Sequence, residues 1–287
     1  MYIPRTYGWI RDPALFHRPK YNLRQKVARV ERPPVIDFRK NTLLGMPPIL
    51  DQKTLGACTA NSVAGVVRYL KMKQALPPQE IWTPSRLAIY YWEREIEGTV
   101  ATDAGATIAD QMKVVREIGC PNEALWPYDP SQFTVTPTLD VRTAAALCKV
   151  PQAKEYEIDT GLDGIMDSLE QGFPISLGFV VYKSFESIAV ATTGIVPMPT
   201  LTTGWKFWSK PDEIAGGHAV WCCGYNQTTA TVDDVPPRSI ICANSWSTMW
   251  GSSGFFFLPF DYAVDGNLAG PFYSVQFVEE SEIKETA

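Results

Sequence analysis

Apolar residues recur at intervals of three and four in three stretches of the first half of the chain, a spacing that predicts amphipathic helices. The first predicted helix follows Gly56 and ends before Pro77-Pro78. The second covers residues 84–96, and the third covers residues 108–118, where Gly119 closes it. The positions that set the period in the first and third helices are Val63, Val66, Val67, Leu70, Ile108, Met112, Val115 and Ile118.

The second half of the chain carries short apolar runs that are typical of buried strands. These runs are residues 175–181, 219–225, 239–243, 254–258 and 272–278. A further short extended piece is expected at residues 35–39. The pattern predicts an α+β protein with a helical half up to about residue 150 and a β-rich half from about residue 151.

The composition of the 287-residue chain is ordinary for a globular protein, since 45% of its residues are hydrophobic and 20% are charged. The formal net charge of -5 gives no argument for nucleic-acid binding. No apolar stretch is long enough to span a membrane, and the first residues lack the basic and apolar regions of a signal peptide. We expect a monomer with no nucleic-acid or membrane partner, either cytoplasmic or exported without a recognisable signal peptide.

The charge is unevenly placed along the chain. Residues 1–33 hold eight Lys or Arg and two acidic residues, a net charge of +6, whereas the remainder carries -11. Opposite charges attract, so this basic N-terminal arm should dock on an acidic body formed by residues 34–287. Pro33-Pro34 is the expected hinge. The expected apolar anchors of the arm are Trp9, Ile10, Leu15 and Phe16. The alternative is a tail that is disordered or wraps the surface without a function.

Cys58 falls at the expected start of the first helix, where exposed N–H groups and the helix dipole favour a thiolate. A nucleophilic thiol also needs a base, and the base needs an orienting partner. The chain has only two histidines, His17 and His218. His218 lies in the run Gly216-Gly217-His218-Ala219-Val220, and Asn244-Ser245-Trp246 follows a predicted strand. Gln52 stands six positions before Cys58.

Each of these residues also has a structural interpretation: a buried small cysteine, a core histidine or a turn asparagine. The whole set in this order is harder to explain by packing alone. A zinc site is a further alternative, with candidate ligands His218, Cys222, Cys223 and Cys242. Neighbouring strand residues point to opposite faces and the chain has no CxxC pair, so we expect neither a metal nor a cofactor.

These residues and their order resemble the papain-like cysteine peptidases, and the short arm points to a bacterial or viral branch of that family. The resemblance extends from Val35 to the C-terminal strands. The other segments that carry it are Ile36-Asp37-Phe38-Arg39, Ala104-Gly105, Trp126-Pro127-Tyr128, Pro174-Ile175-Ser176 and Asn244-Ser245-Trp246-Ser247-Thr248-Met249-Trp250-Gly251. The resemblance implies two lobes, one helical and one resembling a β-barrel, with the active-site cleft between them.

The resemblance also implies a role for each site residue. Cys58 is the nucleophile, and His218 is the base that later protonates the leaving amine. Asn244 holds the imidazole, while Gln52 and the Cys58 backbone N–H form the oxyanion hole. Trp246 covers the pair of His218 and Asn244. The implied cleft-lining residues are Gly105, Ala106, Thr107 and Ile108 on the helical side, and Gly178 and Gly217 on the β side.

Three positions depart from the family pattern. Leu55 stands where the family commonly has a disulfide-forming cysteine, and Thr59 stands where an aromatic residue usually follows the nucleophile. Ala106 replaces one glycine of the pair on the cleft wall, so its methyl group should narrow that site. These departures put the family disulfides in doubt but not the triad, and a reducing compartment suits the six cysteines.

The expected function is hydrolysis of peptide bonds in peptides or proteins through an acyl-thioenzyme. The arm of residues 1–33 would be a segment like a propeptide that inhibits its own enzyme, ahead of a catalytic domain at residues 34–287. One alternative is a catalytically silent, peptide-binding module whose arm permanently fills the cleft. Another is a transferase or amidase that uses the same thiol chemistry.

Overall fold

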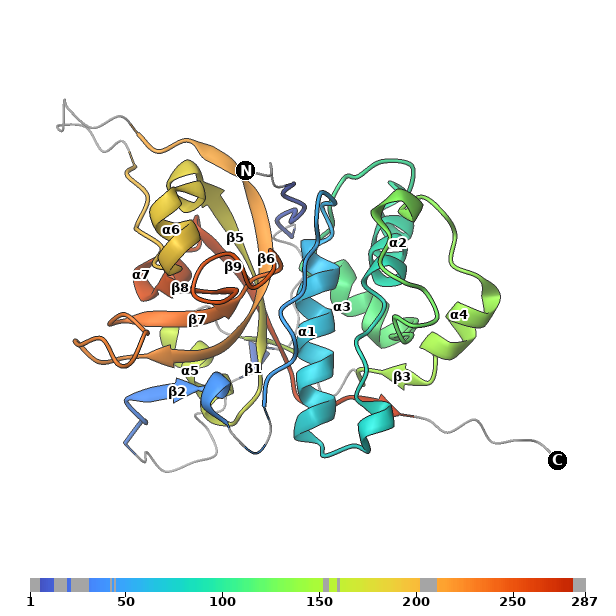
Figure 1. Cartoon of the computed structure of the whole chain (residues 1–287), viewed down its shortest axis with the longest axis horizontal. Coiled ribbons are helices and arrows are strands. Elements are labelled where there is room, and N and C mark those ends of the chain that lie inside the picture. The colour runs from blue at the N-terminus through green and yellow to red at the C-terminus, as the bar shows by residue number, and fades with distance from the viewer. Residues whose placement is uncertain are drawn as a thin grey trace.

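The computed structural model describes residues 6–12, 20–21, 31–41, 43, 45–151, 155–158, 161–201 and 211–280. Within these residues the chain forms two lobes that lie side by side, with the long helix α1 (Cys58–Lys73) at their border (Figure 1). Helices α2 (Arg86–Glu97), α3 (Ile108–Glu117) and α4 (Leu139–Ala145) form the lobe on one side of α1, and the large sheet forms the other (Figure 1).

Local sequence sets the ends of the central helices. The Ser85 hydroxyl accepts a hydrogen bond from the Ala88 backbone N–H and so caps α2, which ends at Gly98 in the left-handed conformation. The Thr107 hydroxyl caps α3 in the same way, by accepting from the Asp110 N–H. The three helices expected from the apolar period are therefore present, with ends within two residues of those expected in α2 and α3.

The large sheet has the order β1-β4-β9-β5-β6-β7-β8, and β2 pairs with β6 beside this path. Its strands are β1 (Lys20–Tyr21), β2 (Val35–Asp37), β4 (Glu155–Ile158), β5 (Ile175–Tyr182), β6 (Ile214–Asn226), β7 (Ser239–Ala243), β8 (Phe255–Pro259) and β9 (Ala269–Val275). The two-lobed papain-like α+β fold is confirmed. The sheet is nevertheless open rather than closed into a barrel, because its ends β1 and β8 pair with β4 and β7 and not with each other.

The chain crosses between the lobes near both ends. Strand β2, from the first part of the chain, joins the sheet through β6. Near the C-terminus, β10 (Glu279–Glu280) pairs with β3 (Cys148–Lys149) of the helical lobe. The second half also holds helices that the apolar pattern did not reveal, namely α5 (Leu162–Glu170), α6 (Ile188–Thr193) and α7 (Phe260–Val264). These helices have nine, six and five residues, so each holds few apolar positions from which to define a period.

One continuous apolar core joins the two lobes and includes residues of α1, α2, α3 and the sheet. All six cysteines are buried, and none of them forms a disulfide bond. Cys222 and Cys242 face each other across β6 and β7, with their sulfur atoms 3.6 Å apart. Of the helices in the described part of the chain, none has the length and apolarity that a membrane span requires.

Candidate active site

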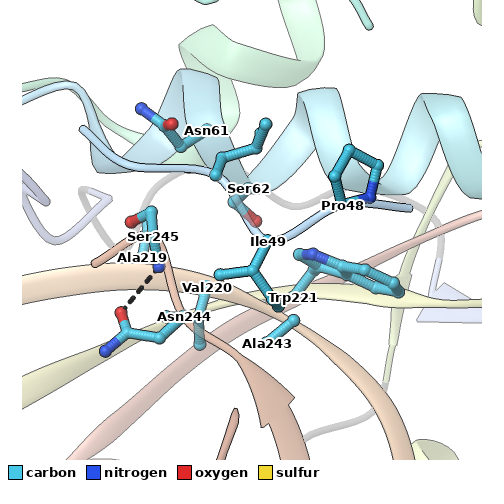
Figure 2. Close-up of a pocket in the computed structure, with 11 residues that line it drawn as sticks. Pro48, Ile49, Asn61, Ser62, Ala219, Val220, Trp221, Ala243, Asn244 and Ser245 are labelled. Atoms are coloured by element: carbon cyan, nitrogen blue, oxygen red, sulfur yellow. Dashed lines mark hydrogen bonds between the residues drawn. The ribbon is translucent and has the colours of Figure 1, made fainter. Parts of the chain in front are cut away.

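Cys58, His218 and Asn244 come from three elements, α1, β6 and the end of β7, and β6 packs against α1. Cys58 is the first residue of α1, His218 lies within β6, and Asn244 directly follows β7, the neighbour of β6 in the sheet. The His218 Nε2 and the Asn244 Oδ1 are 2.8 Å apart, so the amide oxygen can accept a hydrogen bond from the imidazole. Asn244 Oδ1 also accepts from the Ser245 N–H, which fixes the amide (Figure 2).

Aromatic rings enclose the imidazole of His218. The Trp246 ring stacks on it with the ring centroids 5.0 Å apart and an angle of 28°. Trp250 and Phe185 pack edge-on against Trp246, at 5.0 Å and 5.5 Å. Tyr7 meets the imidazole edge-on at 6.2 Å. His218 is completely buried, so the hydrogen bond to Asn244 lies in a medium where water does not compete.

The thiol of Cys58 is completely buried. Burial raises the pKa of Cys58 to about 12, although hydrogen bonds from the backbone of Ala219 and Gly8 lower it. The helix does begin at Cys58, as the apolar pattern predicts, but desolvation outweighs the helix-start effect that favours a thiolate. The charge of Glu93, which accepts a hydrogen bond from Thr59 at 2.7 Å, also raises the pKa of Cys58.

Both ends of the Gln52 side-chain amide form hydrogen bonds. Nε2 donates to the carbonyl oxygens of Leu55 and Thr6, at 3.0 Å and 3.1 Å. Oε1 accepts from the Ser245 hydroxyl at 2.6 Å, and the Gln52 backbone N–H donates to the Ser245 carbonyl at 2.9 Å. Ser245 is a site residue that sequence reasoning missed, although it stands inside the motif Asn244-Ser245-Trp246.

Residues 6–12, called here the arm segment, run between the two lobes. On the helical side, the Ala106 N–H donates to the Gly8 carbonyl at 2.7 Å and the Ile10 N–H donates to the Ala106 carbonyl at 3.0 Å. On the β side, the Trp9 N–H donates to the Gly217 carbonyl at 3.0 Å. The arm segment thus fills the expected cleft like an added strand, and Figure 1 shows this part of the chain between the lobes near the top of α1.

Missing side chains on both walls make room for the arm segment. A Cβ atom at Gly178 would lie 2.1 Å from the Trp9 ring, and one at Gly217 would lie 2.3 Å from the Trp9 carbonyl oxygen. Gly105, with φ +79°, allows the Gly8 backbone to approach in the same way. The sequence predicts Trp9 only as an apolar anchor of the arm, and the structure places its ring against Gly178 on the β side of the cleft.

Two of the expected cleft-lining residues, Thr107 and Ile108, have contacts within the helical lobe or the core. Thr107 caps α3 and donates its backbone N–H to Glu97 at 3.1 Å. Ile108 is completely buried in the core that joins the lobes. The remaining expected cleft residues, Gly105, Ala106, Gly178 and Gly217, all contact the arm segment.

A small pocket lies between α1 and the strands β6 and β7 (Figure 2). Its free volume of about 10 Å³ suits a single water molecule rather than a substrate. The lining residues are Pro48, Ile49, Leu50, Asn61, Ser62, Ala219, Val220, Trp221, Ala243, Asn244 and Ser245. Among the described residues, no cluster of three or more His, Cys, Asp or Glu side chains could hold a metal ion.

Comparisons with known proteins agree with this geometry. A family model described as papain family cysteine protease matches residues 32–266. An uncharacterized peptidase C1-like protein, L477 of Acanthamoeba polyphaga mimivirus, is 35% identical over 295 residues, which cover 97% of this chain and 89% of that protein. A cathepsin B-like protein, CP3 of Giardia intestinalis, is 24% identical over 238 residues, which cover 81% of this chain and 71% of that protein.

Solved structures show the same relationship. Xylellain, a cysteine protease from Xylella fastidiosa, superposes with a TM-score of 0.76 at 28% identity, over 94% of this chain and 96% of that chain. The procathepsin B of Trypanosoma congolense shares the fold, with a TM-score of 0.65 at 18% identity over 96% of this chain and 87% of that chain. The chain belongs to the papain family of cysteine peptidases. It is accordingly a peptidase, a hydrolase of the thiol class.

Proposed function

We propose that this peptidase cleaves peptide bonds with Cys58, His218 and Asn244, and that its own arm segment blocks the cleft until it is displaced. The observation that carries the proposal is the contact between the arm and the oxyanion donor: the Thr6 carbonyl accepts from the Gln52 amide at 3.1 Å. A substrate carbonyl needs this same donor, so arm and substrate compete for one site.

The proposed chemistry follows from these positions. The Cys58 sulfur adds to the scissile carbonyl carbon, and the thiol proton passes to His218. The carbonyl π electrons move to oxygen, where Gln52 and the Cys58 N–H donate hydrogen bonds; one such donor is worth about 3 kcal/mol. His218 then gives its proton to the leaving amine as the C–N bond breaks. Water hydrolyses the resulting thioester with His218 as the base, which regenerates the thiol.

The direction of the arm suits an inhibitor better than a substrate. From residue 6 to residue 9 the arm passes Gln52 first, then Cys58, and then the space at Gly178. A substrate whose second residue before the scissile bond lies at Gly178 would pass these residues in the opposite order. The arm backbone therefore crosses Cys58 in the direction opposite to that of a substrate.

Among the described residues, Arg32 of the arm forms its ion pairs outside the cleft. Arg32 pairs with Glu170 at 2.5 Å, with Asp163 at 3.3 Å and with Asp167. Pro34 is held as well, because its carbonyl accepts from the Gln227 N–H at 3.0 Å, so Pro33-Pro34 is tethered rather than free to act as a hinge. The arm segment itself binds the cleft walls through backbone hydrogen bonds and the Trp9 ring. Added salt should therefore weaken the Arg32 tether more than the cleft contacts. Leu15 and Phe16, the other expected anchors, lie outside the described residues.

The space that Trp9 occupies also indicates substrate preference. It lies beside Gly178, where the absence of a side chain leaves room for a large ring. We expect this pocket to take the second substrate residue before the scissile bond and to prefer bulky apolar groups such as Leu, Phe or Val. Ile108 was expected on its other wall and is buried in the core. A cleavage profile dominated by Arg or Glu at that substrate position would contradict this assignment.

Full occupation of the cleft would also suit a silent module whose arm never leaves. Covalent labelling by an epoxide or vinyl-sulfone probe separates the two proposals, because only a working nucleophile reacts. The probe is applied to the full chain and to Trp9→Ala, with Cys58→Ala as the control. A truncation at Pro34 is less suitable, since it also removes the ion pairs of Arg32. Probe adducts on Cys58 support the peptidase, and a product acylated on a nucleophile other than water would indicate a transferase.

A further inference from the structure

Asp103 lies two residues before Gly105, on the segment that forms the helical wall of the cleft. Its two carboxylate oxygens both accept from the Gly56 backbone N–H, each at 3.0 Å. Its Oδ1 also accepts from the Tyr90 hydroxyl at 2.5 Å. Gly56 stands two residues before the nucleophile, so this carboxylate joins the cleft wall to the loop that carries Cys58. None of the roles proposed above uses it.

The peptide unit between Leu55 and Gly56 links Asp103 to Gln52. On one side of this unit the Gly56 N–H donates to Asp103, and on the other side the Leu55 carbonyl accepts from Gln52 Nε2 at 3.0 Å. Hydrogen bonds arranged in such a chain polarise one another, and a carboxylate is a stronger acceptor than a neutral group. Asp103 therefore fixes the peptide plane on which the Gln52 amide rests.

The remaining contacts of Gln52 show what that orientation achieves. The Ser245 hydroxyl donates to Oε1 at 2.6 Å, and Leu55 engages one direction of Nε2. The other direction of Nε2 points into the cleft, where it meets the Thr6 carbonyl at 3.1 Å. An oxyanion must form at this position for Gln52 to stabilise it. Rotation of the amide by a few tens of degrees would remove the donor from that point.

Helix α2 holds Asp103 in place. The Tyr90 hydroxyl donates to Asp103 and accepts from the Gly105 N–H at 3.0 Å. Burial and the hydrogen bond to Asp103 raise the pKa of Tyr90, so the hydroxyl stays protonated as a donor. One turn later, Arg94 donates to the carbonyls of Val100 and Thr102, at 2.9 Å and 3.0 Å. The loop that carries Asp103 is thus fixed to a rigid helix.

We propose that Asp103 is a positioning residue of the oxyanion hole, which acts through the Leu55–Gly56 peptide to hold the Gln52 amide in its catalytic orientation. The inference rests on the proposed function, since it assumes that Gln52 stabilises the oxyanion. Position 55 is a leucine and not the cysteine that the family commonly has there. The carboxylate supplies a connection between this loop and the cleft wall without a covalent bond.

The test is a double-mutant cycle in the full chain carrying Trp9→Ala, which opens the cleft. Asp103→Asn and Gln52→Ala are made singly and together, and kcat and KM are measured on a fluorogenic peptide amide. Asp103→Asn keeps the side-chain volume but replaces one acceptor by a donor. We expect it to lower kcat about 10–30-fold while KM changes less than about 3-fold. In the Gln52→Ala background the same substitution should cost less than about 2-fold, because the group through which it acts is gone.

Each outcome decides between the alternatives. An equal loss from Asp103→Asn with and without Gln52 would show a general structural role and overturn the inference, while leaving the proposed function intact. Unchanged hydrogen exchange of the Gly56 amide in Asp103→Asn would also overturn it. If Asp103→Asn is unfolded at the assay temperature, Tyr90→Phe replaces it in the same cycle. Turnover that persists in Cys58→Ala would instead overturn the proposed function itself.

Discussion

The Trp9 ring occupies the space that a side chain at Gly178 would need, since a Cβ atom there would lie 2.1 Å from it. Gly178→Ala should therefore expel the Trp9 ring and loosen the arm segment. We expect Cys58 to be alkylated by iodoacetamide at least about 10-fold faster in this variant of the full chain, which corresponds to ~1.4 kcal/mol. Gly161→Ala is the matched control, because an added Cβ there meets nothing within 4 Å. Equal alkylation rates in both variants would contradict the docked position of Trp9.

Removal of the Trp9 side chain should activate the peptidase. Truncation of a buried Trp typically costs about 3–5 kcal/mol, so Trp9→Ala should shift the equilibrium toward the open cleft by at least about 100-fold. Turnover of a fluorogenic dipeptide amide by the full chain reports the change. Ile10→Ala is the control, since Ile10 is 42% exposed and should matter far less. If Trp9→Ala and the parent protein hydrolyse the substrate equally, the arm segment does not inhibit.

Cys58→Ala should abolish turnover and thiol-directed labelling. Cys222→Ala or Cys242→Ala should leave kcat/KM within about 3-fold, because both residues are buried in the sheet with their sulfur atoms 3.6 Å apart and neither belongs to the proposed triad. Mass spectrometry of protein treated with an epoxide probe locates the adduct. An adduct on another cysteine of Cys58→Ala would refute the assignment of the nucleophile.

His218→Ala should slow catalysis more than Asn244→Ala. In the proposed mechanism the imidazole transfers protons, which contributes about 10²–10⁴-fold, whereas Asn244 only orients it through the 2.8 Å contact. We expect Asn244→Ala to lower kcat/KM by about 10–100-fold, measured in the open Trp9→Ala protein. Thermal unfolding checks that both variants are folded. Equal losses in two folded variants would mean that Asn244 does more than orient the ring.

Docking of the arm should depend on pH through Cys58. In the docked protein its pKa is about 12, against an ordinary value of 9.0. The protonated thiol is the form that the docked protein favours, so the contribution of Cys58 to docking is lost as the pH rises from the pKa of Cys58 in the open protein toward about 12. The alkylation rate of the full chain should therefore climb steadily above about pH 9, whereas Trp9→Ala should already react near neutral pH. Identical pH profiles for the two proteins would exclude this effect of the arm.

The open protein should show the signature of a thiolate–imidazolium pair. In Trp9→Ala, kcat/KM should follow a bell-shaped dependence on pH, with an acid limb from Cys58 and a basic limb from His218. A steady-state pH series with the same dipeptide amide measures it. A profile with a single limb would mean that one of the two residues does not titrate during catalysis.

The sequence by itself determined the family and the elements that carry the proposed catalytic residues. The apolar period that begins after Gly56 predicted a helix, and α1 begins at Cys58. The strand pattern predicted β7 at Ser239–Ala243 and so placed Asn244 at a strand end. These features are local, because periodicity shows which face of an element is buried.

Only the tertiary structure decided what each buried face meets. Residues 6–12 have no period, so nothing in their pattern placed Trp9 against Gly178. The hydrogen bond from Ser245 to Gln52 joins residues 193 positions apart, and the link from Asp103 to Gly56 spans 47. Such contacts depend on how the two lobes pack against each other, and this packing is set by residues of the whole core and not by any one segment.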